Sequence, residues 1–331
     1  MSKPLSDTIA VVAGATRGAG RGIARMLGEA GATVYCTGRS TTGNLSPIGR
    51  PETIDETAEL VTDAGGRGIA VRTDHADPDD VRALFNRVRA DFGRLDVLVN
   101  DIGGEDLVEW QPIWKLDVDK GFRFLDTAVR THILTSRYGV PLMIDQGSGL
   151  IIEITDGDHS GYRGTLFYDL VKNQVIRLAY AMATELERKG VTVVALTPGF
   201  LRSEAMLDNF GVAEENWQDA VDQARGFSES ETPCFVGRAV AALCADPAVH
   251  EKTGLALASW TLAKEYGFKD IDGRQPDWMG YVEISVNEIL DRGGPADDDE
   301  RFWVTAWHTQ LKNEPRWKRL VDRIASVTGV S

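Results

Sequence analysis

The sequence AGATRGAGRGI, residues 13–23, joins a short apolar run to a helical pattern and decides the fold. Four glycines stand in it, at Gly14, Gly18, Gly20 and Gly22. A tight turn from strand to helix uses residues without a Cβ where the chain reverses and where a diphosphate approaches the backbone. The helix behind the turn offers amide donors and the positive end of its dipole to that anion. A ligand-free glycine turn is the plainer alternative, but its place between the strand Ile9–Ala13 and the helix Gly22–Ala30 favours a dinucleotide site.

Short β-branched apolar runs alternate with longer amphipathic segments such as Val81–Phe92 and Val171–Lys189. Strands buried on both faces and separated by helices indicate βαβ units. We therefore predict an α/β fold, a three-layer doubly wound parallel β-sheet (a Rossmann fold) of about seven strands, with ligands at the carboxyl ends of the strands. The predicted strands are Ile9–Ala13, Thr33–Thr37, Ile69–Thr73, Leu95–Asn100, Gly149–Thr155, Val191–Thr197 and Leu255–Ala258.

The chain is expected to divide near residue 270. Residues 1–269 are predicted to form the cofactor-binding and catalytic domain, and residues 270–331 a C-terminal extension. Four tryptophans stand in that extension: Trp278, Trp303, Trp307 and Trp317. Tryptophan is enriched both in cores and at interfaces, so the extension either packs on the main domain or forms a lid or subunit contact.

The composition excludes several classes of function. The 331 residues carry a net charge of −14, which argues against nucleic acid and against anionic membranes. No apolar run approaches the roughly 18 residues of a membrane span, and the first residues lack the features of a signal peptide. The three cysteines are too scattered for a zinc site or a disulfide framework, so we expect no metal and a cytoplasmic location.

The second predicted strand ends at Gly38 and Arg39, where a dinucleotide fold reads the adenosine ribose. An acid there favours NAD, whereas an arginine accommodates the 2′-phosphate of NADP. Arg17 in the glycine turn adds a second cation, so we expect NADP(H) as cofactor, unless both arginines are simply solvated. Asp74 and His75, at the end of the third strand, are expected to face the adenine.

Tyr168 and Lys172 lie four residues apart and therefore on one face of a helix. A nearby ammonium favours the phenolate, which makes the phenol a better acid at neutral pH. Such a phenol suits the interconversion of a carbonyl and an alcohol. A lone pair of this kind is common on helices, but this one follows the fifth strand of a dinucleotide fold.

Four motifs in order resemble the short-chain dehydrogenase/reductase family: Gly14-x-x-x-Gly18-x-Gly20, Asn100-Asp-Ile-Gly103, Tyr168-x-x-x-Lys172 and Pro198-Gly-Phe200. The resemblance covers roughly residues 5–265 and implies hydride transfer between a nicotinamide and a carbonyl or alcohol of a small molecule, in a homodimer or homotetramer. It implies that Tyr168 is the acid/base and that Lys172 binds the nicotinamide ribose. The other cofactor-binding residues that it implies are Gly14, Thr16, Arg17, Gly18, Ala19, Gly20, Arg39, Asp74, His75, Asn100, Ile102, Gly103, Pro198, Gly199, Phe200 and Ser203.

The end of the fifth strand departs from the family. The family places there, 12 or 13 residues before the tyrosine, a serine that donates a hydrogen bond to the substrate oxygen; here those positions hold Asp156 and Thr155. An ionised aspartate only accepts hydrogen bonds. Either Thr155 supplies the hydroxyl with Asp156 turned to solvent or a cation, which we favour, or Asp156 is protonated, or the substrate itself carries a donor or a positive charge. Ser160 is a further candidate.

His132 stands where the family has an asparagine that supports a water in a proton relay to the lysine. A histidine also donates and accepts through its two nitrogens, although a helix residue with no such role is the plainer alternative. Ala13 replaces a threonine that braces the sheet.

The leading hypothesis is an NADP(H)-dependent reductase or dehydrogenase with Tyr168 as general acid/base. The rival is a non-catalytic NADP(H)-binding or sensing protein, supported by the replaced serine and asparagine; a scaffold without cofactor has little support. The substrate is not readable, but residues 201–225 are the expected lid, and Trp110, Trp114 and Phe167 the expected lining of an apolar cavity.

Overall fold

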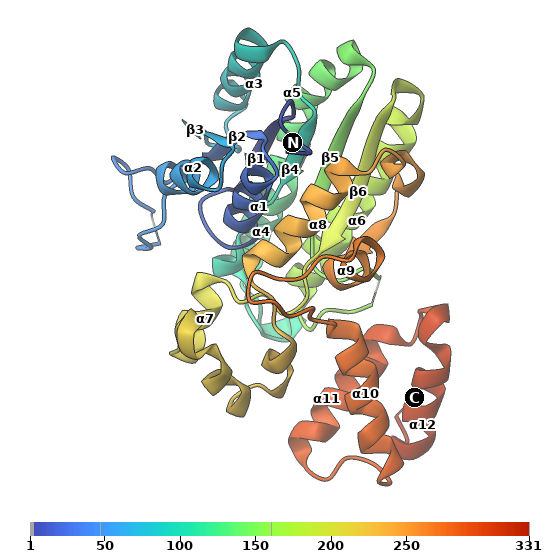
Figure 1. The fold of residues 1–331 in the computed structure, drawn as a ribbon. Helices are drawn as coiled ribbons and strands as arrows, with labels where there is room; N and C mark the ends of the chain where they lie inside the picture. The colour runs from blue at the N-terminus through green and yellow to red at the C-terminus, as the bar shows by residue number, and fades with distance from the viewer. Residues whose placement is uncertain (1–2, 47, 160, 331) are drawn as a thin grey trace.

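The computed structural model describes residues 3–46, 48–159 and 161–330, and Figure 1 shows the fold. A parallel sheet of seven strands has the order β3-β2-β1-β4-β5-β6-β7. This topology confirms the predicted doubly wound Rossmann fold. The strands are β1 Ile9–Ala13, β2 Thr33–Gly38, β3 Arg67–Arg72, β4 Val97–Asn100, β5 Gly149–Ile154, β6 Val191–Thr197 and β7 Ala256–Ala258.

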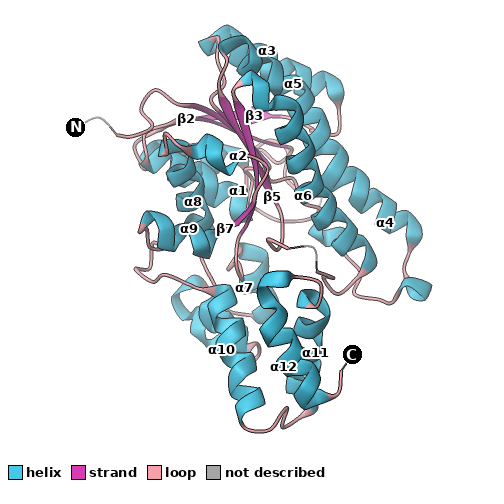
Figure 2. Cartoon of the chain, turned by 90° about the vertical axis from the view of Figure 1, so that its right-hand side faces the viewer, coloured by secondary structure: helices cyan, strands magenta, loops and turns pink. Residues whose placement is uncertain are grey.

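Helices cover both faces of the sheet (Figures 1 and 2). The α-helices of the described residues are α1 Gly18–Glu29, α2 Ile54–Asp63, α3 Pro78–Phe92, α4 Val118–Leu125, α5 Thr131–Gln146, α6 Leu166–Leu186, α7 Glu204–Phe210, α8 Pro233–Ala245, α9 Ser259–Tyr266, α10 Trp278–Asp291, α11 Asp298–Leu311 and α12 Lys318–Thr328. Within β1, Ala10 and Val12 face the core shared with α1, α2 and α8, whereas Ile9 and Val11 face the core shared with α3, α5 and α6. This alternation of side chains along a strand gives the sheet a buried core on each face.

Helix α1 begins four residues earlier than predicted, inside the glycine turn. Gly22 lies within the helix, and a Cβ there would stand 2.1 Å from the backbone oxygen of Pro233 in α8. The close approach of α1 and α8 therefore requires a glycine at this position. Helix α6 likewise begins at Leu166 and not at Val171, which places Tyr168 and Lys172 in its first two turns.

The C-terminal extension consists of α10, α11 and α12, which lie together beyond one end of the sheet (Figures 1 and 2). These helices bury a shared core that includes Val282, Val304 and Ile324. Ala258 and Trp260 of the main domain belong to the same cluster, so the extension is packed onto the sheet domain through β7 and α9.

Among the described residues, we find no helix with the length and apolarity that crossing a membrane requires.

Candidate active site

A cavity of about 1290 Å³ opens at the carboxyl ends of the strands. It is larger than the roughly 300–1,000 Å³ typical of a pocket for one small ligand. The turns after β1, β2, β3, β4, β5 and β6 all contribute to its wall, as do α6, α7, α10 and α11. Its size fits a dinucleotide together with a substrate.

The glycine turn forms one end of this cavity. Gly14 has φ +92°, and a Cβ there would stand 2.3 Å from the backbone oxygen of Asp101. A Cβ at Gly20 would stand 2.4 Å from the backbone oxygen of Gly14. Gly14, Thr16, Arg17, Gly18 and Ala19 line the cavity, whereas Gly20 lies behind them. The glycines are therefore needed for close backbone packing beneath the cavity.

Two carboxylates meet the amides at the start of α1. The Gly18 amide donates to Oε2 of Glu204 over 2.8 Å, and the Gly20 amide donates to Oδ2 of Asp101. Amides at a helix N-terminus attract anions, so these carboxylates occupy donors of the kind that diphosphate oxygens use. The end of α1 thus has the chemistry of an anion site, and Glu204 reaches it from α7, which lies in the predicted lid segment.

The part of the cavity where we expect the adenosine contains Arg39, Ser40 and Ser46, together with Arg17. Arg39 is exposed, and within the described residues its guanidinium enters no ion pair. Arg17 is partly engaged: its Nη2 donates to Ser46 Oγ over 3.2 Å, and its Nε lies 3.9 Å from Glu52. The Arg39 guanidinium therefore has fewer partners among the described residues than the Arg17 guanidinium.

Asp74 and His75 both line the cavity, but their side chains have partners within the protein. Asp74 Oδ1 accepts from the Ala76 amide over 3.0 Å. The buried His75 ring lies between Thr37 Oγ1 and Thr135 Oγ1, at 2.8 Å from each. Burial, reinforced by the nearby His132, lowers the pKa of His75 to about 3, so the ring is neutral. His75 therefore holds β2, β3 and α5 together behind the cavity wall.

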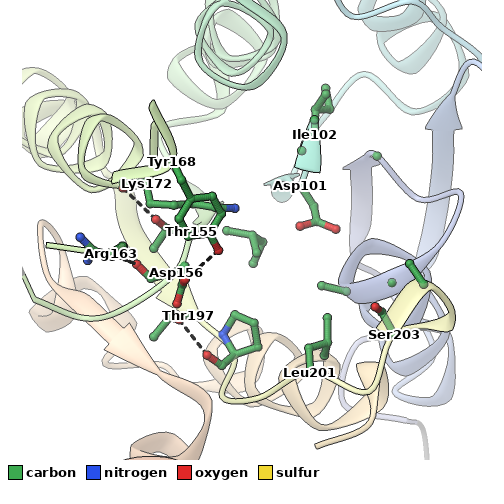
Figure 3. Close-up of a pocket in the computed structure, with 18 of the residues that line it drawn as sticks. Asp101, Ile102, Thr155, Asp156, Arg163, Tyr168, Lys172, Thr197, Leu201 and Ser203 are labelled. Carbon is green, nitrogen blue, oxygen red and sulfur yellow. Dashed lines mark hydrogen bonds between the residues drawn. The ribbon is translucent and has the colours of Figure 1, made fainter. Parts of the chain in front are cut away.

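The end of β5 brings the reactive side chains together (Figure 3). Oδ2 of Asp156 accepts a hydrogen bond from the Tyr168 hydroxyl over 2.7 Å. The Thr155 hydroxyl instead donates to the backbone oxygen of Lys172 over 2.9 Å, and its side chain is buried. This differs from our expectation that Asp156 turns to solvent or a cation while Thr155 offers its hydroxyl. β5 ends at Ile154, and the chain then turns so that Asp156 faces α6.

Helix α6 holds Tyr168 and Lys172 on one face, and both line the cavity. The Lys172 ammonium lies 5.4 Å from the centre of the Tyr168 ring. Trp110 contacts the same ring with centroids 5.4 Å apart, and Phe124 stacks on it at 6.4 Å. The phenol is thus fixed by aromatic contacts, with its oxygen directed at Asp156.

Arg163 fixes the loop that follows Asp156. Its guanidinium is buried and donates to backbone oxygens of Asp156, over 2.5 Å, of Gly161, over 2.9 Å, and of His159. Asp158, in the same loop, accepts from Arg316 of the extension over 2.8 and 3.0 Å. Burial opposes the ionised form of Asp158, but the hydrogen bonds from His159 and Arg316 prevail and lower its pKa. Ser160 lies outside the described residues.

His132 does not line the cavity. Its Nδ1 lies 2.6 Å from Glu153 Oε2, and its Nε2 lies 3.2 Å from the backbone oxygen of Ile102. Asn100 is also buried behind the wall, where its amide donates to the other Glu153 oxygen over 2.7 Å. This buried network braces the turn of Ile102 and Gly103, which do line the cavity.

The turn after β6 forms the wall opposite Arg39. Pro198, Gly199, Phe200 and Ser203 line the cavity there, and Ser203 caps α7 by accepting from the Met206 amide over 3.3 Å. The Gly199 amide donates to Oε2 of the buried Glu231 over 2.9 Å. Burial, reinforced by Asp270, raises the pKa of Glu231 to about 8 against the hydrogen bonds from Ser259 and Gly199 and the charge of Arg202.

The extension contributes aromatic and apolar side chains to the cavity. Trp110 lines it, whereas Trp114 is exposed elsewhere and Phe167 packs on Phe122, so the prediction for those two was wrong. From the predicted lid, the segment 203–206 and Leu201 reach the cavity. Sequence reasoning missed Asp101, Tyr162, Trp278, Met279, Phe302, Trp307 and Gln310 as lining residues. The clustering of tryptophans was the one signal that pointed to the extension.

A family model described as short chain dehydrogenase matches residues 8–211. Because that span exceeds half of the chain, this protein belongs to the short-chain dehydrogenase family, as its motifs predicted. It is an oxidoreductase that acts on the alcohol or carbonyl group of a small molecule with a nicotinamide cofactor.

Three further comparisons refine this relationship. The chain is 36% identical to dehydrogenase/reductase SDR family member 1 of Mus musculus, over 96% of this chain and 97% of the relative. It is 32% identical to cis-4-hydroxycyclohexanecarboxylate dehydrogenase of Sinomonas cyclohexanicum, over 60% of this chain and 76% of the relative. A solved structure from Beutenbergia cavernae, assigned as an NAD(P)-dependent gluconate 5-dehydrogenase with NADP bound, has TM-score 0.62 and 29% identity, and covers 78% of this chain and 97% of its own.

Proposed function

We propose that this protein is an NADP(H)-dependent carbonyl reductase or alcohol dehydrogenase in which Tyr168 is the general acid/base. The observation that carries the proposal is the convergence of the glycine turn, Arg39 and the Tyr168/Lys172 pair on one cavity. When bound, NADP(H) supplies or takes up the hydride at its nicotinamide ring. The chain's own residues bind that cofactor, orient the substrate and move the proton.

The fit of the cofactor rests on two features of the protein. The first is the set of amides at the start of α1, which donate hydrogen bonds to carboxylate oxygens and can therefore bind an anion. The second is Arg39, which takes the position of the ribose-reading acid and enters no ion pair with a described residue. An arginine there suits a 2′-phosphate by charge-assisted hydrogen bonds, which supports NADP(H) over NAD(H).

The substrate end supports a bulky and largely apolar substrate. Trp110, Tyr162, Trp278, Phe302 and Trp307 line the same cavity as Tyr168 and Asp156, and Trp110 contacts the Tyr168 ring directly. This aromatic wall suits cyclic alcohols. Two relatives are named for such substrates: the cis-4-hydroxycyclohexanecarboxylate dehydrogenase and a 3β-hydroxysteroid dehydrogenase of Mediterraneibacter gnavus. Lys172 is proposed to hold the nicotinamide ribose and to keep the phenol acidic.

The test is turnover of NADPH with cyclic ketones, and of NADP⁺ with cis-4-hydroxycyclohexanecarboxylate and a 3β-hydroxysteroid. Tyr168→Phe should reduce turnover by at least about 100-fold, the lower range for general acid/base catalysis. Tyr180→Phe is the matched control, because Tyr180 lies on the same helix but is exposed. Intact turnover in Tyr168→Phe would refute the mechanism. NADPH binding without turnover on the whole panel would favour the non-catalytic alternative.

We also propose a homodimer or homotetramer. Phe122 of α4, Ile133 of α5, and Leu170 and Tyr180 of α6 are large apolar side chains exposed to solvent. Sedimentation equilibrium measures the mass in solution directly, and a monomer at micromolar concentration would contradict this proposal.

A further inference from the structure

We propose that Asp156 is a catalytic residue that exchanges the proton of Tyr168, so that the two side chains form a relay between the substrate oxygen and the carboxylate. The inference rests on the proposed function and adds the destination of the proton that Tyr168 releases. It assigns to the residue in the family's serine position a proton-accepting role that a serine does not have.

The relay follows from the hydrogen bond between the two side chains. A phenol has one hydrogen to donate, and its oxygen keeps lone pairs that accept. In this structure the Tyr168 hydroxyl donates to Oδ2 of Asp156 over 2.7 Å, so its hydrogen points toward the carboxylate (Figure 3). The Tyr168 oxygen can still accept a hydrogen bond from a substrate alcohol in the cavity that both residues line.

The surroundings keep the Asp156 carboxylate able to take a proton. Within the described residues Asp156 forms no ion pair. Arg163 binds the backbone oxygen of Asp156 and other carbonyls of the loop, and Arg316 binds Asp158. Besides the pair itself, the charged and titratable groups that line the same cavity include Lys172 from α6, Asp158, His159 and Arg163 from the loop, and Asp101 from the turn after β4.

A second observation concerns His132, which takes the position of the relay asparagine in the family. Both of its ring nitrogens are engaged, Nδ1 by Glu153 at 2.6 Å and Nε2 by the Ile102 backbone oxygen at 3.2 Å. Its side chain is buried and does not line the cavity. A proton that leaves Tyr168 therefore finds its acceptor at Asp156 and not at residue 132.

The step balances in both directions. In oxidation, the alcohol O–H bond breaks and its proton moves to the Tyr168 oxygen, while the Tyr168 O–H bond breaks and its proton moves to Asp156. The carbonyl double bond forms as the hydride leaves the carbinol carbon. Tyr168 ends as a neutral phenol and Asp156 as a carboxylic acid, which returns the proton to water. Reduction runs the same transfers backward and starts from a protonated Asp156.

Two variants and two readouts test the relay. Asp156→Asn keeps the size of the side chain but cannot take up a proton, and Asp156→Ser restores the family's residue. Tyr168 ionisation is followed by ultraviolet difference spectra between each protein and its Tyr168→Phe counterpart, which needs neither cofactor nor substrate. Because a carboxylate acceptor stabilises the neutral phenol, Asp156→Asn should lower the midpoint of Tyr168 ionisation by about one pH unit or more. Asp63 is exposed in α2, so Asp63→Asn is the control and should leave the midpoint of Tyr168 ionisation unchanged.

The second readout is the pH profile of alcohol oxidation and ketone reduction on the panel used above. Asp156→Asn should lose at least about 100-fold in oxidation rate and should change the shape of the pH profile, because its amide cannot take up the proton that Tyr168 gives away. An unchanged Tyr168 midpoint and an unchanged profile in both Asp156 variants would overturn the relay while leaving the proposed function intact. Turnover that survives Tyr168→Phe would instead overturn the proposed function.

Discussion

The Tyr168 hydroxyl lies 2.7 Å from Oδ2 of Asp156 and donates its hydrogen to it. This contact links Tyr168, the proposed acid/base of a short-chain dehydrogenase, to a carboxylate at the position where the family has a serine. Because the phenol has a single hydrogen, an ionised Asp156 and a substrate carbonyl compete for it. We therefore expect the residue at position 156 to influence the balance between oxidation and reduction.

Replacing Arg39 by alanine should weaken NADPH binding by about tenfold or more and leave NADH binding unchanged. A lost hydrogen bond between charged groups costs about 1.5–3 kcal/mol, and only NADPH carries the 2′-phosphate. Calorimetric titration with both nucleotides measures the effect. Arg82→Ala, exposed on α3, serves as the control. Equal losses for NADPH and NADH would contradict the assignment of Arg39.

Replacing Glu204 by glutamine should tighten dinucleotide binding about two- to fivefold. The Glu204 carboxylate accepts from the Gly18 amide over 2.8 Å, so its negative charge competes with a diphosphate for the start of α1. A charge near a helix end contributes about 0.3–1 kcal/mol, which sets the size of the effect. Fluorescence titration with NADPH is the measurement, with the exposed Glu59→Gln as control. Weaker binding would show that Glu204 shapes the turn and does not compete with the cofactor.

Replacing Arg316 by glutamine should lower kcat/KM for bulky substrates without changing NADPH affinity. Arg316 ties the extension to Asp158, two residues from Asp156, and the loss of this ion pair frees the loop. The half-exposed arginine should cost no more than about 1 kcal/mol of unfolding free energy. Arg319→Gln, exposed on α12 and without an ion pair among the described residues, is the control. Identical kinetics for Arg316→Gln and Arg319→Gln would show that the ion pair between Arg316 and Asp158 does not affect catalysis.

Glu231 should make the protein less stable as the pH rises toward 8. Burial raises its pKa in the native state to about 8, from an ordinary value of 4.5, so the native state holds a proton that the unfolded state releases between these values. The stability that this proton contributes is complete below pH 4.5 and is lost as the pH rises, at up to about 1.4 kcal/mol per pH unit. Urea unfolding of wild type and Glu231→Gln at pH 5, 6, 7 and 8 isolates the effect. Parallel curves would contradict it.

The sheet was predictable because each strand is a short apolar run that stands between longer helical patterns. β1 and β6 occupy the predicted residues. The glycine turn and Tyr168/Lys172 were equally readable, because each depends on spacing within one segment. The orientation of Thr155 and Asp156 was not, since neighbouring residues at a strand end point to opposite sides and only the turn after Ile154 decides between them. Contacts of Glu204, Trp307 and Arg316 join segments far apart in the chain, which no local pattern reveals.

The most direct test of the central claim is hydride transfer itself. The protein is incubated with a cyclic ketone and NADPH that carries deuterium at the transferred position of the nicotinamide, and the product alcohol is examined by mass spectrometry. We predict one deuterium on the carbinol carbon with wild type, and at least about 100-fold slower labelling with Tyr168→Phe. NADPH binding with no labelled alcohol from any ketone of the panel, or equal labelling by wild type and Tyr168→Phe, would contradict it.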